Sequence, residues 1–186
     1  KTVDRFAEQV ADGDDGMRAM TVLLRKLAGF SGLVHENMYR FTGWRFMEIG
    51  RRLERCLTMA RLLETMTGPE APDGAHDMLI EIGDSVITHR RRYGGDIGRL
   101  SVIDLMALDA LNPRSIVHQL VEIRAETAQL PGAMVAGRPS ALGRVAIRLE
   151  ADWTTASAET LDEAAFAELA GYLESFSDLV SATCFA

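Results

Sequence analysis

Apolar residues recur every three or four positions along most of this chain, which is the spacing that gathers them on one face of an α-helix. In the segment 43–66 the apolar face consists of Phe46, Ile49, Leu53, Cys56, Ala60 and Leu63. A similar face begins near residue 113 and consists of Ile116, Leu120, Ile123, Thr127 and Leu130. No long stretch alternates with the two-residue period of a β-strand. The pattern therefore predicts an all-α protein with minimal strand content.

Turn-forming residues divide this pattern into separate helices. We expect helices over 17–41, 43–66, 75–92, 113–129, 140–155 and 161–183, and short ones over 1–11 and 102–108. An acidic turn, 12–16, and a loop rich in Gly and Pro, 68–74, separate some of them. Helices joined by short turns predict an antiparallel helical bundle of about five long and two or three short helices, in a single domain spanning 1–186.

The same pattern predicts the ends of two helices and the buried side of two others. Asn112 is the expected N-cap of one helix, with Pro113 at its first helical position, and Thr160 is the expected N-cap of the last helix. We expect two apolar stripes to face the core: Met17, Met20, Leu24 and Leu27, and Met78, Leu79, Ile82 and Val86.

Composition narrows the class of partner. The net charge of -7 argues against a general nucleic-acid binder, which needs a basic surface to neutralise phosphates. The only lysines are Lys1 and Lys26, so arginine supplies nearly all of the positive charge. Arginine suits bidentate recognition of carboxylate or phosphate, although genomic base composition is an equally good explanation of its abundance.

The cysteines and histidines point away from metal and cofactor chemistry. Cys56 and Cys184 are lone thiols within helical patterns, which indicates small core residues in a reducing, cytoplasmic compartment. No histidine follows a glutamate at the Glu-x-x-His spacing of di-iron bundles, so we expect no metal and no cofactor. No apolar run approaches the roughly 18 residues of a membrane span. The chain starts at Lys1 rather than at Met, so we expect it to be part of a longer protein.

The helix 43–66 carries the first candidate site. Trp44, Glu48, Arg51 and Arg55 are spaced four, three and four residues apart, so they share one face, and Glu54 lies on a third side beside Gly50. Pairs one turn apart interact: Glu36 with Arg40 and Glu48 with Arg52 can form ion pairs, whereas Arg51 and Arg55 repel unless an anion lies between them. Gly50 inside a helix suggests a close backbone approach. The alternative is a solvated face of weak pairs.

Two helix ends carry further candidates. His89-Arg90-Arg91-Arg92-Tyr93 ends a helix, where its cations either complement the helix dipole or form an anion clamp. Asp109-Ala110-Leu111-Asn112-Pro113-Arg114-Ser115 precedes the start of a helix, where unpaired N–H groups can hold a phosphate or carboxylate and Arg114 would add a fork. An ordinary cap with a surface arginine is the alternative.

These motifs together resemble a known family. Glu36-Asn37-Met38, Gly43-Trp44-Arg45-Phe46, Gly50-Arg51-Arg52-Leu53-Glu54-Arg55, Arg90-Arg91-Arg92-Tyr93, and Leu108-Asp109 followed by Asn112-Pro113-Arg114-Ser115 and Gln119 resemble the bacterial alpha-E domain family, over roughly residues 20 to 185. The resemblance implies an all-helical fold and a chain that corresponds to the C-terminal part of longer members. It also implies partnership with circularly permuted ATP-grasp ligases and transglutaminase-like proteins, in a system that makes or trims peptides or amides.

The resemblance further implies a set of recurrent polar positions. They are Glu36, Arg40, Trp44, Arg51, Glu54, Arg55, Arg91, Tyr93, Asp109, Asn112, Arg114 and Ser115. One departure lies at the end, where the aromatic-rich Tyr-Phe segment of the family is replaced by Thr183-Cys184-Phe185.

Three hypotheses for function follow. The first is a non-catalytic binding or accessory module, whose Arg/Glu-lined cleft takes an acidic peptide, a carboxylate or a partner ligase. The second is an enzyme of amide formation or cleavage with Glu36 or Glu54 as general base. The third is a structural domain, in which a buried charge network fixes helix register or a homo-oligomer interface.

Overall fold

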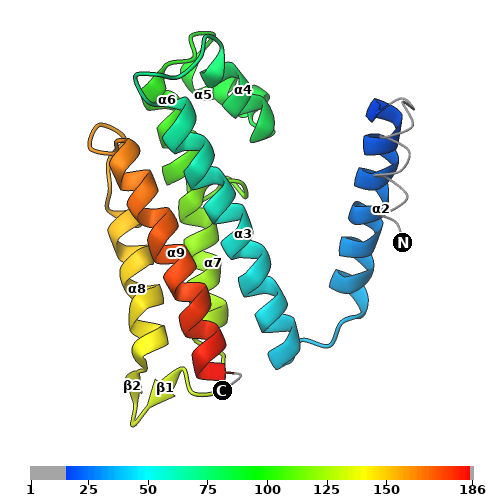
Figure 1. Ribbon diagram of the computed structural model, residues 1–186, viewed down its shortest axis with the longest axis vertical. Helices are drawn as coiled ribbons and strands as arrows, with labels where there is room; N and C mark the ends of the chain where they lie inside the picture. The colour runs from blue at the N-terminus through cyan, green and yellow to red at the C-terminus, as the bar shows by residue number, and fades with distance from the viewer. Residues whose placement is uncertain (1–15, 185–186) are drawn as a thin grey trace. The chain divides into compact units, whose positions relative to one another are not determined.

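The computed structural model describes residues 16–184 (Figure 1). The expected helix 1–11 and most of the acidic turn lie outside the described residues. The chain forms two compact units, Lys1–Trp44 and Arg45–Ala186, which are described one at a time.

The first unit contains α2, Gly16–Asn37, and the non-helical residues 38–41. The helix expected over 17–41 therefore ends four residues early, at Asn37, whose side-chain amide donates to Leu33 O at 2.9 Å. The stripe that we expected in the core is exposed instead, at Met17, Met20, Leu24 and Leu27. That prediction was wrong because helical spacing identifies an apolar face but not what covers it.

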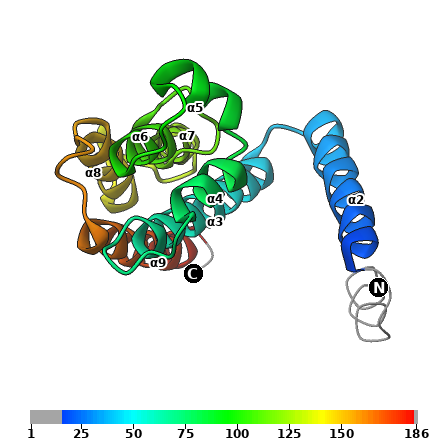
Figure 2. The same ribbon diagram turned by 90° about the horizontal axis from the view of Figure 1, so that it is seen from above.

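The second unit consists of helices and one minimal hairpin. Its elements are α3 (Thr42–Met66, of which the first turn belongs to the first unit), α4 (Ala75–Ile82), α5 (Val86–Tyr93), α6 (Arg99–Ile103), the π-helix η1 (Asp104–Leu108), α7 (Ile116–Thr127), β1 (Met134–Val135), β2 (Arg138–Pro139), α8 (Ala141–Thr154) and α9 (Glu163–Cys184). Within this unit α3, α7, α8 and α9 lie side by side, with α4 to α6 at one end of them and the hairpin at the other (Figures 1 and 2). The all-α class is confirmed, and the strand content is two residues per strand.

The core of the second unit lies between these four long helices. The expected apolar face of α7 is confirmed, because Ile116, Leu120 and Ile123 are all at most 2% exposed. The face of α3 is confirmed from Ile49 onward, and α9 adds the fully buried Phe166. Burial of a large apolar side chain stabilises the fold by about 1.5–3 kcal/mol, so these faces hold the four helices together.

The helix expected over 75–92 is in fact two helices. Gly83 N donates to Leu79 O and ends α4, and Asp84 then takes a left-handed backbone conformation with φ of 49° before α5 begins. Leu79 and Ile80 are buried, whereas Met78, Ile82 and Val86 are 48%, 43% and 38% exposed. The expected inward stripe was wrong at these three positions. The buried side of α4 is that of Leu79 and Ile80, and Val86 lies beyond the break on a separate helix.

Two helices begin a few residues later than expected. The N-cap of α7 is Ser115, whose hydroxyl accepts from His118 N at 3.1 Å, and not Asn112. At the start of α9 the carboxylate of Asp162 accepts from Ala165 N at 2.9 Å, whereas Thr160 donates its hydroxyl to Ser157 O. In both places the expected cap lies in a preceding turn, and the serine or aspartate nearest the first helical residue forms the cap.

Both cysteines are free thiols. Cys56 is fully buried in α3, and burial raises the pKa of its thiol. Cys184, the last described residue, is half-buried. Among residues 16–184, every helix is too short or too polar to cross a membrane.

Candidate functional site

The polar face of α3 begins with a buried carboxylate. Glu48 is only 5% exposed, and its Oε2 accepts from Arg51 Nη2 at 2.5 Å and lies 3.6 Å from Arg52 Nε. The expected pair between Glu48 and Arg52 is therefore confirmed. Because its carboxylate is buried, this part of the face is not a set of solvated surface pairs.

We call these charged residues of α3 and their neighbours the arginine cluster, and Arg52 links this cluster to α7. Its Nη1 donates to the buried Gln119 at 3.3 Å and its Nη2 donates to Glu122 at 3.4 Å. The amide of Gln119 in turn donates to Pro113 O at 2.7 Å. The inner half of the cluster consists of Glu48, Arg52 and Gln119. It fixes α3 against α7 and against the segment that precedes α7.

The outer half of the cluster consists of arginines without a carboxylate partner. Arg55 lies one turn after Arg51, and Arg114 comes from the segment before α7. Burial is the largest cause that lowers the pKa of Arg55, followed by the charges of Arg51, Arg52 and Arg114, while Glu48 acts in the opposite sense. Among residues 16–184, neither Arg55 nor Arg114 has an ion pair. The structure therefore brings Arg55 of the first candidate site and Arg114 of the third together, with neither in an ion pair and with Glu54 in the same lining.

Arg114 lies at the rim of two hollows in the second unit. One has a volume of about 220 Å³ and is lined by Glu54, Arg55, Thr58, Met59, Leu62, Ile82 and Arg114. The other, of about 340 Å³, is lined by Gly83, Asp84, Ser85, Thr88, Arg92, Asp109, Leu111, Asn112, Pro113 and Arg114. The expected site residues Glu54, Arg55, Asp109, Asn112 and Arg114 thus line two hollows that share one arginine.

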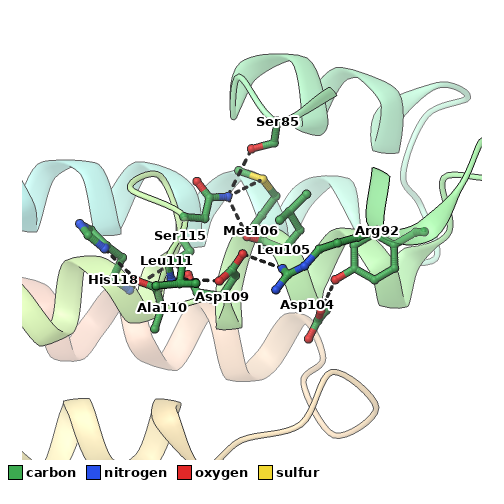
Figure 3. Close-up of polar contacts among 12 residues, drawn as sticks. Ser85, Arg92, Asp104, Leu105, Met106, Asp109, Ala110, Leu111, Ser115 and His118 are labelled. Carbon is green, nitrogen blue, oxygen red and sulfur yellow. Dashed lines mark hydrogen bonds and ion pairs between the residues drawn. The ribbon is translucent and has the colours of Figure 1, made fainter. Parts of the chain in front are cut away.

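One arginine of the second candidate site, Arg92, is paired with a carboxylate of the same unit. Arg92 Nη1 donates to Asp109 at 2.7 Å, as Figure 3 shows, so the Arg92 cation already has a carboxylate partner. Tyr93 donates its hydroxyl to Asp104, and burial, then this hydrogen bond, raises the pKa of Tyr93 to about 12. Arg91 is exposed and has no side-chain partner among the described residues. Of the three arginines at 90–92, Arg92 is therefore already paired, whereas the anion clamp expected from the sequence stays a prediction for Arg90 and Arg91.

Two residues of the third candidate site hold the loop together. The buried amide of Asn112 donates to Leu105 O at 2.9 Å and to Ser85 Oγ at 3.3 Å (Figure 3). The hydroxyl of Ser115 donates to Asp109 O at 2.6 Å and caps α7. Asn112 Oδ1 accepts from Arg114 N at 3.0 Å, so this loop positions Arg114 rather than exposing N–H groups for an anion.

Three expected site residues belong to the first unit. Glu36 is exposed, and the expected pair with Arg40 is not formed because α2 ends at Asn37, between the two residues. The guanidinium of Arg40 lies 3.7 Å from the ring centroid of Trp44 instead, and Arg40 Nη2 donates to His35 O at 2.9 Å. Trp44 is 5% exposed whereas Arg40 is exposed, so the cation–π contact lies at the surface, over a buried ring.

Gly50 does not mark a close backbone approach, since a Cβ added there would have no atom within 4 Å. The same holds for Gly171 in the middle of α9. Because alanine favours a helix over glycine, Gly50→Ala and Gly171→Ala should each raise the free energy of unfolding by about 0.5–1 kcal/mol in urea denaturation. A loss of stability in Gly50→Ala alone would show that something approaches this position after all.

A serine and a histidine meet in a place that the sequence did not indicate. His89 is 1% exposed, and its Nε2 lies 2.8 Å from Ser101 Oγ. The Ser101 hydroxyl also donates to Gly98 O at 2.9 Å. In that arrangement it accepts from His89 Nε2–H, and its own hydrogen points away from the imidazole. Within residues 16–184, no three His, Cys, Asp or Glu side chains are grouped so that they could hold a metal ion.

His89 should make stability depend on pH. Burial lowers its pKa below the ordinary 6.5, and Asp77 opposes this in part. The unfolded chain therefore binds more protons as the pH falls below about 6.5, and this part of the stability is lost as the pH falls through the lowered value. We expect His89→Gln to flatten the urea-denaturation profile between pH 7 and 5 relative to the wild type. Equal slopes in the two proteins would contradict a buried neutral His89.

The fold and the site define a class: an all-helical module with an arginine-rich face that is only partly neutralised. The chain belongs to the alpha-E family, whose profile matches residues 1–185 and which is described as a predicted alpha-helical domain with a conserved ER motif. The chain contains one Glu-Arg dipeptide, Glu54-Arg55, and both residues line the 220 Å³ hollow.

Similar proteins occur in mycobacteria. The chain is 34% identical over 149 residues to uncharacterized proteins of Mycobacterium tuberculosis and Mycobacterium bovis. The match covers 74% of this chain but only 17% of the length of those relatives. No solved structure matches the chain.

Proposed function

We propose that this chain is a non-catalytic binding module that holds an anionic group on the outer arginines of α3. One observation carries the proposal: Arg55 and Arg114 lie in one charged cluster without a carboxylate partner among the described residues. Adjacent guanidinium groups repel, so an anion between them would remove the cost of their proximity. Carboxylate and phosphate are the groups that the guanidinium fork matches.

The structural hypothesis applies to the inner residues of the same cluster. Arg52 bonds both to Glu48 on its own helix and to Gln119 on α7, which is what a register-fixing network needs. Arg55 and Arg114 lie at a hollow and take no part in that network. The binding and structural roles therefore fall on different residues and can be tested separately.

The enzyme hypothesis is less well supported. Glu36 and Glu54 are both exposed, so neither is the buried carboxylate that a tuned general base requires. The buried carboxylate is Glu48, and two arginines already occupy it. These observations favour binding over catalysis at this site.

We propose further that the module works with an ATP-grasp-type peptide or amide ligase, or with a transglutaminase-like protein, in the cytoplasm. Two observations support this wider role. The matched region is a small share of the mycobacterial relatives, which leaves most of their length for other parts. The two thiols of this chain are free, as expected for a reducing compartment. Co-purification of partners with the tagged wild-type chain and with its Arg55→Gln variant, from the source cells, would test the partnership.

Anion binding is tested by thermal unfolding against phosphates, nucleotides, carboxylates and acidic peptides. A ligand at a hundredfold excess over its Kd stabilises the fold by about 2.7 kcal/mol, which raises the Tm by several degrees in a chain of this size. We expect at least one class to produce such a shift in the wild type. The absence of any shift across the panel would overturn the proposal.

Arg55→Gln should abolish that shift and leave the unliganded Tm within about 2 °C of the wild type, because Arg55 forms no ion pair with the described residues. Arg61→Gln is the matched control on the same helix. Arg61 pairs with Glu174 at 2.6 Å at an exposed position and does not line the 220 Å³ hollow, so its loss should leave the ligand shift intact. Equal loss of the shift in both variants would mean that the anion binds α3 without a specific site.

A further inference from the structure

The hollow beside Arg55 and Arg114 has both charged and apolar lining residues. Its charged residues are Glu54, Arg55 and Arg114, its apolar residues are Met59, Leu62 and Ile82, and Thr58 adds a hydroxyl. Along α3 the lining residues follow a one-turn spacing, so they form one continuous strip on that helix. A ligand that fills this hollow must therefore present an anion and an apolar group next to each other.

The size of the hollow limits that apolar group. A volume of about 220 Å³ lies below the roughly 300–1,000 Å³ of sites for drug-sized ligands. It suits one aliphatic side chain.

The charge balance limits the anion. Glu54 stands in the same lining as the two arginines and contributes a negative charge of its own. A doubly charged group placed there would meet this carboxylate, whereas a single carboxylate takes the two guanidinium groups with less repulsion. This favours a carboxylate over a phosphate.

We propose that the hollow binds the C-terminal carboxylate of a peptide that ends in an aliphatic residue, with the carboxylate on Arg55 and Arg114 and the side chain against Met59, Leu62 and Ile82. The inference rests on the proposed anion-binding function and names its ligand class. A carboxylate and a branched side chain on the same carbon are what the last residue of such a peptide offers. The apolar contact supplies selectivity, because each methylene in a hydrophobic pocket changes affinity by about tenfold or more.

Calorimetric titration of the whole chain tests this with five probes. They are acetyl-Gly-Gly-Leu with a free C-terminus, the same peptide as its C-terminal amide, acetyl-Gly-Gly-Gly with a free C-terminus, 4-methylpentanoate, and inorganic phosphate. We expect the leucine acid to bind at least tenfold more tightly than each of the other four. Arg114→Gln should weaken the leucine acid at least tenfold and leave the amide unchanged.

Two isoleucines provide a matched pair of variants. Ile82→Ser removes part of the apolar wall and should weaken the leucine acid about tenfold while leaving phosphate unchanged. Ile87 lies on α5 outside the hollow and is 75% exposed, so Ile87→Ser should bind like the wild type. Thr58→Phe fills the hollow from an exposed position and serves as the second blocking variant if Ile82→Ser fails to fold.

Each outcome separates this inference from the proposed function. If phosphate or the glycine peptide binds as tightly as the leucine acid, the anion site stands and the aliphatic ligand class is overturned. If 4-methylpentanoate equals the leucine acid, a peptide as the source of the carboxylate is overturned. If none of the probes binds and the wider anion panel gives no thermal shift, both proposals fail.

Discussion

Replacing Glu48 by alanine should lower the free energy of unfolding by about 3 kcal/mol, because it leaves two cations against the core without their carboxylate. Arg52 has a side-chain exposure of only 14% and retains only long contacts to Gln119 and Glu122. Arg51 is 32% exposed and can turn toward water, which keeps the effect at the low end of the range for a buried pair. Urea denaturation at pH 7 measures the loss, and a fall in Tm of roughly 6–12 °C should accompany it.

The double variant Glu48→Met with Arg52→Met tests the reason for that loss. Removing both charges and keeping the volume should recover most of the stability, since replacing a buried ion pair by apolar residues is often neutral or stabilising. The double variant should also keep the anion-dependent thermal shift, because Arg55 and Arg114 remain. A double variant as unstable as Glu48→Ala would show that the hydrogen bonds across α3 and α7 are needed, and not charge compensation.

The sequence predicts the uninterrupted helices of the core better than the segments in which a helix is broken. The faces of α3 and α7 follow one uninterrupted helical period, and Ile49, Leu63 and Ile123 are buried as predicted. The segment 75–92 failed because Gly83 and Asp84 break it, and a left-handed residue is a three-dimensional choice that periodicity does not record. The exposed stripe of α2 failed for a different reason, since an apolar face does not identify its partner.

The candidate site was predictable only along one helix. Spacing alone placed Glu48 beside Arg52 and Arg51 beside Arg55, because the rise of an α-helix fixes those neighbours. The approach of Arg114 to Arg55 depends on how α7 packs on α3, which no local pattern contains. Asn112 was a candidate binding residue, but its side chain hydrogen-bonds to Leu105, Ser85 and Arg114.

Replacing Phe166 by alanine should lower the free energy of unfolding by about 3–5 kcal/mol. Phe166 is 0% exposed, and its ring lies 5.7 Å from that of Trp153, which joins α9 to α8. The truncation removes a large apolar side chain from the core and leaves a buried cavity that solvent does not reach. Tyr172→Ala is the matched control on α9: it removes a ring that is 52% exposed and should cost less than about 1 kcal/mol.

Tryptophan fluorescence locates the effect of Phe166→Ala. The chain has two tryptophans, Trp44 in the first unit and Trp153 in the second, so Trp44→Phe leaves Trp153 as the single reporter. In that background Phe166→Ala should shift the emission to longer wavelength, since the indole loses its ring contact with Phe166 and gains contact with water. Neither α8 nor α9 contributes a residue to the lining of the 220 Å³ hollow. The affinity of the folded protein for anions should therefore be unchanged. A stable variant with unchanged emission would contradict the packing of α8 on α9, and a folded variant with weakened binding would show that the site depends on the far side of the bundle.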